Sequence, residues 1–197
     1  MSEKQQRRPF SQRLFRFLLS PPWRWPGRIL RRLTGDVPLG LRIINFSFQR
    51  ILRRNAEVAW MVHFTSRASG DIEIGRNVWK SFASSGGCYI QGINGIRIGD
   101  DTIFAPGVKI ISANHDPDNM ERWIKADPLI IGKRCWIGVN AVILPGVRLG
   151  DDVVVGAGAV VTKSFPDGSV IAGVPARVIR RRATRPLEQK ETAAEGG

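Results

Sequence analysis

Of the two histidines in this chain of 197 residues, His115 lies in the setting that best suits catalysis. It stands in the run Ser112-Ala113-Asn114-His115-Asp116, whose polar side chains are able to orient an imidazole ring. A neutral imidazole with a pKa near physiological pH can remove a proton from an alcohol. No Ser-His-Asp or Cys-His set with recognisable spacing competes with it. We therefore predict His115 as a general base and assign no role to His63.

The segment around His115 interrupts a regular repeat. An aliphatic or aromatic residue recurs every six positions on both sides of it, at Ile98, Phe104 and Ile110 and then at Ile131, Ile137, Ile143, Leu149, Val155 and Val161. A period of six fits neither a helix nor an alternating strand, whereas short fixed repeats stack as coils. Small or β-branched residues follow four places later, as a narrow interior requires: Cys135, Ala141, Val147, Val153 and Ala159.

Three hexads should make one triangular turn, which predicts a parallel β-helix over residues 55–176. The polar, proline-containing segment 112–129 cannot pack inside such a coil, so we expect it to leave the coil as a loop. Loops that a rigid scaffold positions are frequent sites of function. Residues 177–197 then form a basic C-terminal segment with a polar tail.

The net charge of +13 belongs to the two ends of the chain. Residues 1–54 hold 13 Lys or Arg and 2 acidic residues, whereas residues 55–176 hold 11 and 12. Because the centre of the chain is nearly neutral, this distribution argues against nucleic-acid binding by the whole protein, although RNA binding by the basic arm is an alternative. No stretch is apolar enough to predict a transmembrane helix or a secretory signal.

The basic arm, residues 1–54, alternates arginines with large apolar side chains and is predicted to be partly helical. Basic amphipathic helices with Trp and Phe favour anionic membrane surfaces. We therefore expect membrane contact through residues 9–33. For residues 39–54 we expect a helix that caps the open end of the coil.

The hexads, the loop that bears Asn-His, and the runs WIGVNAVILPGV, VGAGAVVTKSFP and VIAGVPARVI form a specific combination. Together they resemble the hexapeptide-repeat acyltransferases, above all the galactoside and maltose O-acetyltransferases and their polysaccharide-modifying relatives. The resemblance covers residues 60–182. It implies an all-β, left-handed parallel β-helix, a homotrimer with active sites between subunits, and acetyl-CoA as the donor.

The resemblance also implies roles for individual residues. His115 matches the catalytic base, and a second set matches positions that contact the donor: Trp136, Val139, Ala157, Thr162, Lys163, Arg177 and Arg180. The acceptor-binding Ala-Asn-Phe-Asn stretch of the galactoside enzymes is replaced here by WKSFASSGGCYIQGING. We assign the acceptor side to Asn114, Asp116, Ser85 and Asn94, and expect an acceptor other than a simple galactoside.

Two histidines are too few for the three-imidazole zinc site of the hexapeptide-repeat carbonic anhydrases, so no metal is predicted. The expected reaction is acetyl transfer from acetyl-CoA to a sugar hydroxyl of a cell-surface polysaccharide or lipid-linked precursor. Alternatives are an N-acetyltransferase for an amino-sugar nucleotide and a non-catalytic scaffold. We expect a cytoplasmic protein in peripheral contact with the inner face of the cytoplasmic membrane.

Overall fold

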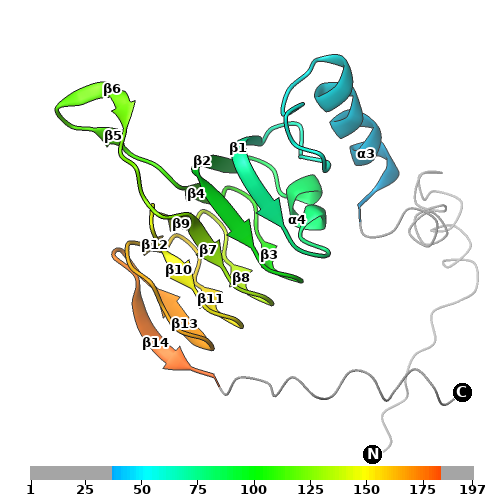
Figure 1. The fold of residues 1–197 in the computed structure, drawn as a ribbon. Coiled ribbons are helices and arrows are strands. Elements are labelled where there is room, and N and C mark those ends of the chain that lie inside the picture. Colours follow the sequence, from blue (N-terminus) through cyan, green and yellow to red (C-terminus); the bar gives the residue numbers. More distant parts are fainter. Residues whose placement is uncertain (1–36, 183–197) are drawn as a thin grey trace, which may run out of the picture. The chain divides into compact units, whose positions relative to one another are not determined.

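A computed structural model describes residues 37–182 (Figure 1). The chain divides into two units, residues 1–39 and 40–197, and the fold below belongs to the second. The membrane contact predicted for residues 9–33 lies outside the described residues. No helix between residues 37 and 182 is long and apolar enough to cross a membrane.

Short parallel strands stack in three ladders. Strands β1 (Arg67–Ile74) and β2 (Tyr89–Ile98) are long, and their two halves serve ladders 1 and 2 in turn. Ladder 1 continues with β4 (Lys109–Ile111), β9 (Val142–Ile143) and β12 (Val160–Val161), and ladder 2 with β7 (Leu129–Ile131) and β10 (Arg148–Leu149). Ladder 3 consists of β3 (Ile103–Phe104), β8 (Trp136–Ile137), β11 (Val154–Val155) and β13 (Ser169–Ala172), with β14 (Arg177–Arg181) antiparallel at its edge.

The register of the ladders gives the length of one turn. Trp136 pairs with Val154 in ladder 3, and Val142 pairs with Val160 in ladder 1. Both pairs are 18 residues apart, which equals three hexads per turn. The stacked parallel coils of the predicted fold are therefore confirmed.

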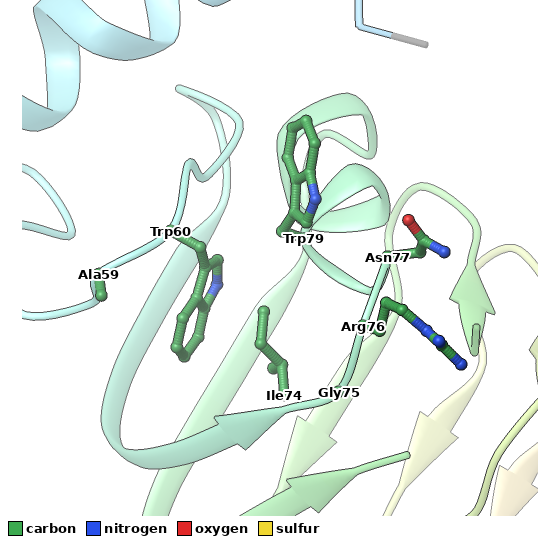
Figure 2. Close-up of a pocket in the computed structure, with 7 residues that line it drawn as sticks. All are labelled: Ala59, Trp60, Ile74, Gly75, Arg76, Asn77 and Trp79. Carbon is green, nitrogen blue, oxygen red and sulfur yellow. The ribbon is translucent and has the colours of Figure 1, made fainter. Parts of the chain in front are cut away.

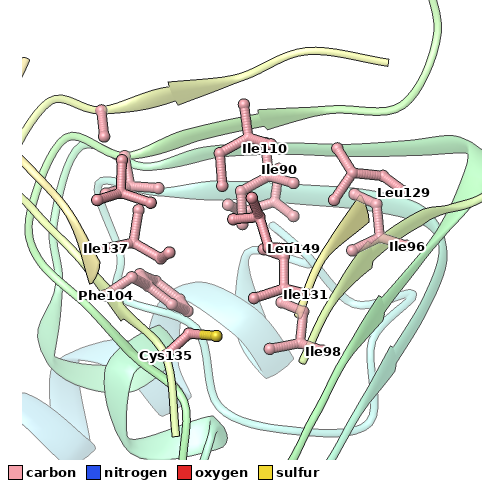
Figure 3. Close-up of a cluster of buried hydrophobic side chains, with 14 of the residues drawn as sticks. Ile90, Ile96, Ile98, Phe104, Ile110, Leu129, Ile131, Cys135, Ile137 and Leu149 are labelled. Atoms are coloured by element: carbon pink, nitrogen blue, oxygen red, sulfur yellow. The ribbon is translucent and has the colours of Figure 1, made fainter. Parts of the chain in front are cut away.

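The residues that recur every six positions form the core (Figure 3). From Ile131 to Val161, each of these side chains is at most 2% exposed. The small residues four places later are buried as well, and Cys135 is 1% exposed. Burial raises the pKa of the Cys135 thiol to about 11, so this group is an inert part of the core.

Each corner of the coil requires a particular backbone conformation. The third residue after the inward-facing one has a positive φ in turn after turn: Asn77, Asp101, Gly107, Arg134, Asn140, Gly146, Asp152 and Gly158. This left-handed conformation favours Gly, Asn and Asp, which explains most of these residue types. The glycine that directly follows the aliphatic residue is needed for another reason, because it lets the backbones of successive turns lie close together. A Cβ on Gly132 would lie 2.5 Å from the backbone of Gly150.

Helical segments lie at the first coil. Helix α4 (Trp79–Ser84) lies beside β3, and its Ser81 Oγ accepts a hydrogen bond from the Phe104 backbone N–H at 3.2 Å. Helix α3 (Leu39–Phe46) continues into the π-helix η2 (Ser47–Ile51). The Asn45 side chain joins α3 to the carbonyl of Ala83 and the N–H of Phe64, both at 2.9 Å.

Truncating an aliphatic side chain should lower the free energy of unfolding far more at an inward position than at an outward one. Ile143→Ala removes a side chain that is 0% exposed and should lower the free energy of unfolding by about 2–5 kcal/mol. Ile179→Ala, at a position that is 68% exposed, should change it by less than about 0.5 kcal/mol. Urea unfolding at one protein concentration compares the two variants, and equal effects would contradict the assignment of the inward positions.

Candidate active site

His115 lies on a hairpin that projects from the stacked strands (Figure 1). Strand β5 (His115–Asp116) pairs antiparallel with β6 (Asn119–Trp123). The hairpin leaves the coil after β4 of ladder 1 and returns at β7 of ladder 2, so it occupies the corner between these ladders. The side chains along it are mostly exposed to solvent.

The hairpin fixes the tautomer of His115. The Nδ1 atom lies 2.6 Å from the backbone carbonyl oxygen of Met120. A carbonyl oxygen only accepts hydrogen bonds, so Nδ1 must carry the proton and donate it. The lone pair of the neutral ring is then on Nε2, the atom that is left to act as a base.

An aromatic ring holds the imidazole from the side. His115 and Trp123 face each other across the two strands of the hairpin, and their ring centroids are 3.8 Å apart with an interplanar angle of 35°. The Met120 carbonyl and the Trp123 ring therefore restrain the imidazole from two directions. Strand β6 supplies both contacts, so the imidazole and the groups that restrain it belong to one hairpin.

Asn94 ties the two legs of the hairpin to the coil. Its Nδ2 donates to the carbonyl of Ser112 at 3.0 Å and to that of Ile124 at 2.8 Å, one on each side of the hairpin. Its backbone N–H donates to Ser112 Oγ at 2.9 Å. The buried Gln91 adds a fourth hydrogen bond, since its Oε1 accepts from the N–H of Ala113 at 3.2 Å. These bonds determine where the hairpin leaves the coil.

The residues predicted for the acceptor have different surroundings. Asn114 is exposed, and its backbone carbonyl accepts from the N–H of Ile124 at 2.9 Å. Asp116 accepts from the N–H of Asp118 at 3.0 Å within the hairpin turn. Ser85 is buried, and its hydroxyl donates to the carbonyl of Phe104 at 2.8 Å. The side chains of Asn94, Asp116 and Ser85 thus have structural partners, and the acceptor-binding role of all four residues stays a prediction.

Two of the predicted donor contacts lie together at the corner between ladders 3 and 1. Gly158 N–H donates to the carbonyl of Val139 at 2.8 Å, which stacks the corner at Ala157 directly on the corner at Val139. A Cβ on Gly138 would lie 2.7 Å from the backbone N of Ala157. Both Val139 and Ala157 are exposed, so the corner offers a shallow outer surface with little side-chain bulk.

The other predicted donor residues lie elsewhere on the coil. Thr162 and Lys163 follow β12 at the corner between ladders 1 and 2, the corner from which the hairpin leaves. Trp136 lies outward on ladder 3 with 55% of its surface exposed, and Arg177 and Arg180 lie on β14 at the edge of that ladder. The structure thus places the predicted site residues on two corners and one face of the same chain, rather than around one point.

Sequence reasoning missed Trp123 and Gln91. Trp123 lies within the interrupting segment, and its place among polar residues was a usable signal, but its partner depends on how the hairpin pairs. Gln91 is a polar residue in β2 between Ile90 and Gly92, and all three residues are buried. A buried polar side chain beside an ejected loop indicates an anchor for that loop, because buried polar groups need partners.

A separate pocket of about 470 Å³ lies near the first coil (Figure 2). Its lining comes from two segments, Ala59–Trp60 and Ile74–Trp79, and includes no residue of the hairpin. Arg76 at its rim lies 3.6 Å from Asp100 and 3.8 Å from Asp101. The pocket therefore holds no base and is apart from the predicted catalytic group.

Within residues 37–182, no three His, Cys, Asp or Glu side chains gather as a metal site requires.

Comparison with known proteins agrees with this geometry. The family model described as hexapeptide repeat of succinyl-transferase matches residues 128–163. WbbJ of Escherichia coli K12, named for O-acetyl transfer in lipopolysaccharide biosynthesis, is 39% identical over 106 residues, which cover 47% of this chain and 54% of WbbJ. C18B11.09c of Schizosaccharomyces pombe, named for acetyltransferase activity, is 33% identical over 143 residues, 66% of this chain and 69% of that protein.

A solved structure is also similar. The hexapeptide-repeat acetyltransferase VCA0836 of Vibrio cholerae, crystallised with acetyl coenzyme A, is 28% identical with a TM-score of 0.51 and covers 59% of this chain and 63% of its own. Stacked hexads with an ejected histidine hairpin define a hexapeptide-repeat protein. The extent of the match to the S. pombe protein shows that the chain belongs to the hexapeptide-repeat acetyltransferases, as the motifs predict. The chain spans about half the length of WbbJ, at 54%.

The anchor at Asn94 predicts how firmly the hairpin is held. Asn94→Ala removes two hydrogen bonds and should speed tryptic cleavage after Arg122 and Lys125 by about tenfold, because the legs separate more often from the coil. Asn119→Ala removes only one bond within the turn, to the N–H of Glu121, and serves as the control. Equal cleavage rates in the two variants would contradict the anchoring role.

Proposed function

We propose that this protein is an acetyl-CoA-dependent O-acetyltransferase that acts on a sugar hydroxyl, with His115 as its general base. The observation that carries the proposal is the 2.6 Å contact between His115 Nδ1 and the Met120 carbonyl, which leaves Nε2 as a proton acceptor on an exposed hairpin. Membership of the hexapeptide-repeat acetyltransferases supports the reaction class, and the relative named for O-acetyl transfer supports oxygen as the acceptor atom.

The proposed reaction is a direct transfer. Nε2 of His115 removes the proton of the acceptor hydroxyl as its oxygen attacks the thioester carbonyl. The new C–O bond forms, the C–S bond breaks, and the thiolate takes the proton back from His115. Trp123 and the Met120 carbonyl hold the ring while its charge changes. No covalent acyl-enzyme is needed, since bringing the two substrates together in the correct orientation lowers the barrier.

We further propose that three chains wind as left-handed β-helices and assemble as a homotrimer with sites between subunits. The arrangement of the predicted residues supports this, because His115 lies at the corner between ladders 1 and 2, whereas Val139 and Ala157 lie at the corner between ladders 3 and 1. Contact between different corners of two chains would bring the base of one subunit to the donor surface of another.

The donor surface fits the expected co-substrate. Ala157 and Gly158 are exposed and small, and a Cβ on Gly158 would meet nothing within 4 Å, so a pantetheine arm could lie against the backbone there, bordered by the exposed ring of Trp136. Arg177 and Arg180 on β14, together with Thr162 and Lys163, carry hydrogen-bond donors and positive charge suited to a nucleotide phosphate. The solved relative with acetyl coenzyme A supports acetyl-CoA as the donor.

For the acceptor, we propose a sugar of a surface polysaccharide or of its lipid-linked precursor, with Asn114, Asp116, Ser85 and Asn94 on the acceptor side. The relative named for lipopolysaccharide biosynthesis supports this class of acceptor. In this proposal residues 1–54 are an arm, residues 55–176 the catalytic coil and residues 177–197 a basic tail. The arm holds the protein on the inner face of the cytoplasmic membrane, where residues 9–33 make contact.

The first test removes the proposed base. His115→Ala should lower turnover at least about a hundredfold while acetyl-CoA still binds, because only proton transfer is lost. Release of free CoA with a panel of sugars and polysaccharide fragments measures turnover, and calorimetry measures donor binding. His63→Ala is the matched control and should keep its turnover. Near-normal activity in His115→Ala would remove the proposed base.

The second test addresses the shared site. Ala157→Trp should block the donor surface, and His115→Ala should lack the base, so each variant alone is inactive. Mixed trimers should regain activity when the two variants are produced together, because some sites then combine an intact corner with an intact histidine. Mixed oligomers without any regained activity would place both residues within one subunit's own site.

A further inference from the structure

Helix α3 and the π-helix η2 are amphipathic in the reverse of the usual sense. Their polar residues Asn45 and Gln49 face inward and are 0% and 4% exposed. The large apolar side chains face solvent instead, with Ile43 at 58% exposed, Phe46 at 56% and Ile51 at 70%. Helices on globular proteins normally bury their apolar face, so an outward apolar face indicates a binding surface.

The buried polar residues attach this surface firmly to the coil. Asn45 bridges the carbonyl of Ala83 and the N–H of Phe64, both at 2.9 Å. Gln49 Nε2 donates to the carbonyl of Trp60 at 2.8 Å and to two others nearby, and its Oε1 accepts from the N–H of Val62 at 3.2 Å. These buried hydrogen bonds fix the helix with its apolar face outward, so the exposure of that face does not result from loose packing.

Basic side chains accompany the apolar ones. Arg50, Arg53 and Arg54 are exposed at the end of η2, and none of them has an ion-pair partner within the described residues. Residues 37–54 contain four arginines and no acidic residue. Leu52, 65% exposed, lies between these arginines, so apolar and cationic groups share the surface.

Charge decides between the occupants of this surface. A second copy of the same surface would bring two arginine clusters together, and like charges repel. Residues 1–36 carry nine Lys or Arg and two acidic residues, so this segment is also repelled. An anionic lipid surface offers both an apolar interior for Ile43, Phe46 and Ile51 and negative charge for the arginines.

We propose that Ile43, Phe46, Ile51 and Leu52, with Arg50, Arg53 and Arg54, form a docking surface for an anionic lipid bilayer. This surface is distinct from residues 9–33, and it belongs to the same compact unit as the hairpin that bears His115. It holds the coil itself against the membrane at its first turn. The inference goes beyond the proposed reaction, since docking does not depend on which group is transferred.

The test uses the full chain and vesicles of phosphatidylcholine with or without phosphatidylglycerol. Phe46→Gln with Ile51→Gln should weaken binding to the anionic vesicles at least about tenfold, because the inserted apolar surface is lost. Arg50→Gln, Arg53→Gln and Arg54→Gln together should weaken it about a hundredfold, with little change on pure phosphatidylcholine. Ile103→Gln with Ile179→Gln is the matched control, at positions 53% and 68% exposed, and should bind like the unchanged protein.

A second measurement locates the contact directly. Both native cysteines are buried, so a fluorophore on Phe46→Cys labels the surface selectively. Brominated acyl chains should quench this label in the bound protein. An unquenched label on bound protein, or unchanged binding in the Gln variants, would assign the contact to another part of the chain and overturn the proposal. A change of oligomeric state in those variants without lipid would also overturn it, because a second copy would then cover the surface.

Discussion

The hydrogen bond from His115 Nδ1 to the Met120 carbonyl is the interaction on which the site depends. It selects one tautomer, directs the basic lone pair to Nε2, and does so with backbone from the same hairpin. The Trp123 ring at 3.8 Å limits rotation of the imidazole. A base that is oriented before substrate binds needs no rearrangement during proton transfer, which is the property that general-base catalysis requires.

The regular coil is what makes such a hairpin possible. Each turn repeats the same inward side chain, small residue and left-handed corner, so the scaffold is rigid and leaves few ways to accommodate an insertion. The inserted hairpin between β4 and β7 is attached instead by side chains of β2, the strand that lies beside both of them in the sheet. Asn94 and Gln91 come from β2, and they bind the backbone at the base of the hairpin.

Much of the fold could be predicted from the sequence because the six-residue period determines which side chains lie inside and how many residues make one turn. The aliphatic residue of each hexad, such as Ile137 or Leu149, lies inside, and the 18-residue register follows from three such units. The orientation of α3 could not be predicted in the same way. The sequence predicted a helix that caps the coil over residues 39–54 but not which of its faces lies inward, and the buried hydrogen bonds of Asn45 and Gln49 turn Ile44 and Ile51 outward.

The candidate site was predictable only in part for a related reason. His115 was recognisable because it interrupts a period, whereas the contacts that orient it arise from antiparallel pairing inside the interruption, where no period applies. Val139 and Ala157, which are predicted to contact the donor, can be recognised as a stacked pair because they are 18 positions apart. Their relation to His115 is not predictable, because His115 lies on the inserted hairpin, where no period applies.

The tautomer of His115 is the quantity that tests this account most directly. Long-range ¹H–¹⁵N correlation spectra of the labelled protein, recorded at alkaline pH and assigned with His63→Ala and His115→Ala, distinguish a protonated Nδ1 from a protonated Nε2. The account predicts that neutral His115 carries its proton on Nδ1. A proton on Nε2 would place the basic lone pair on Nδ1, which faces the Met120 carbonyl instead of an acceptor hydroxyl, and would contradict the proposed role of this residue.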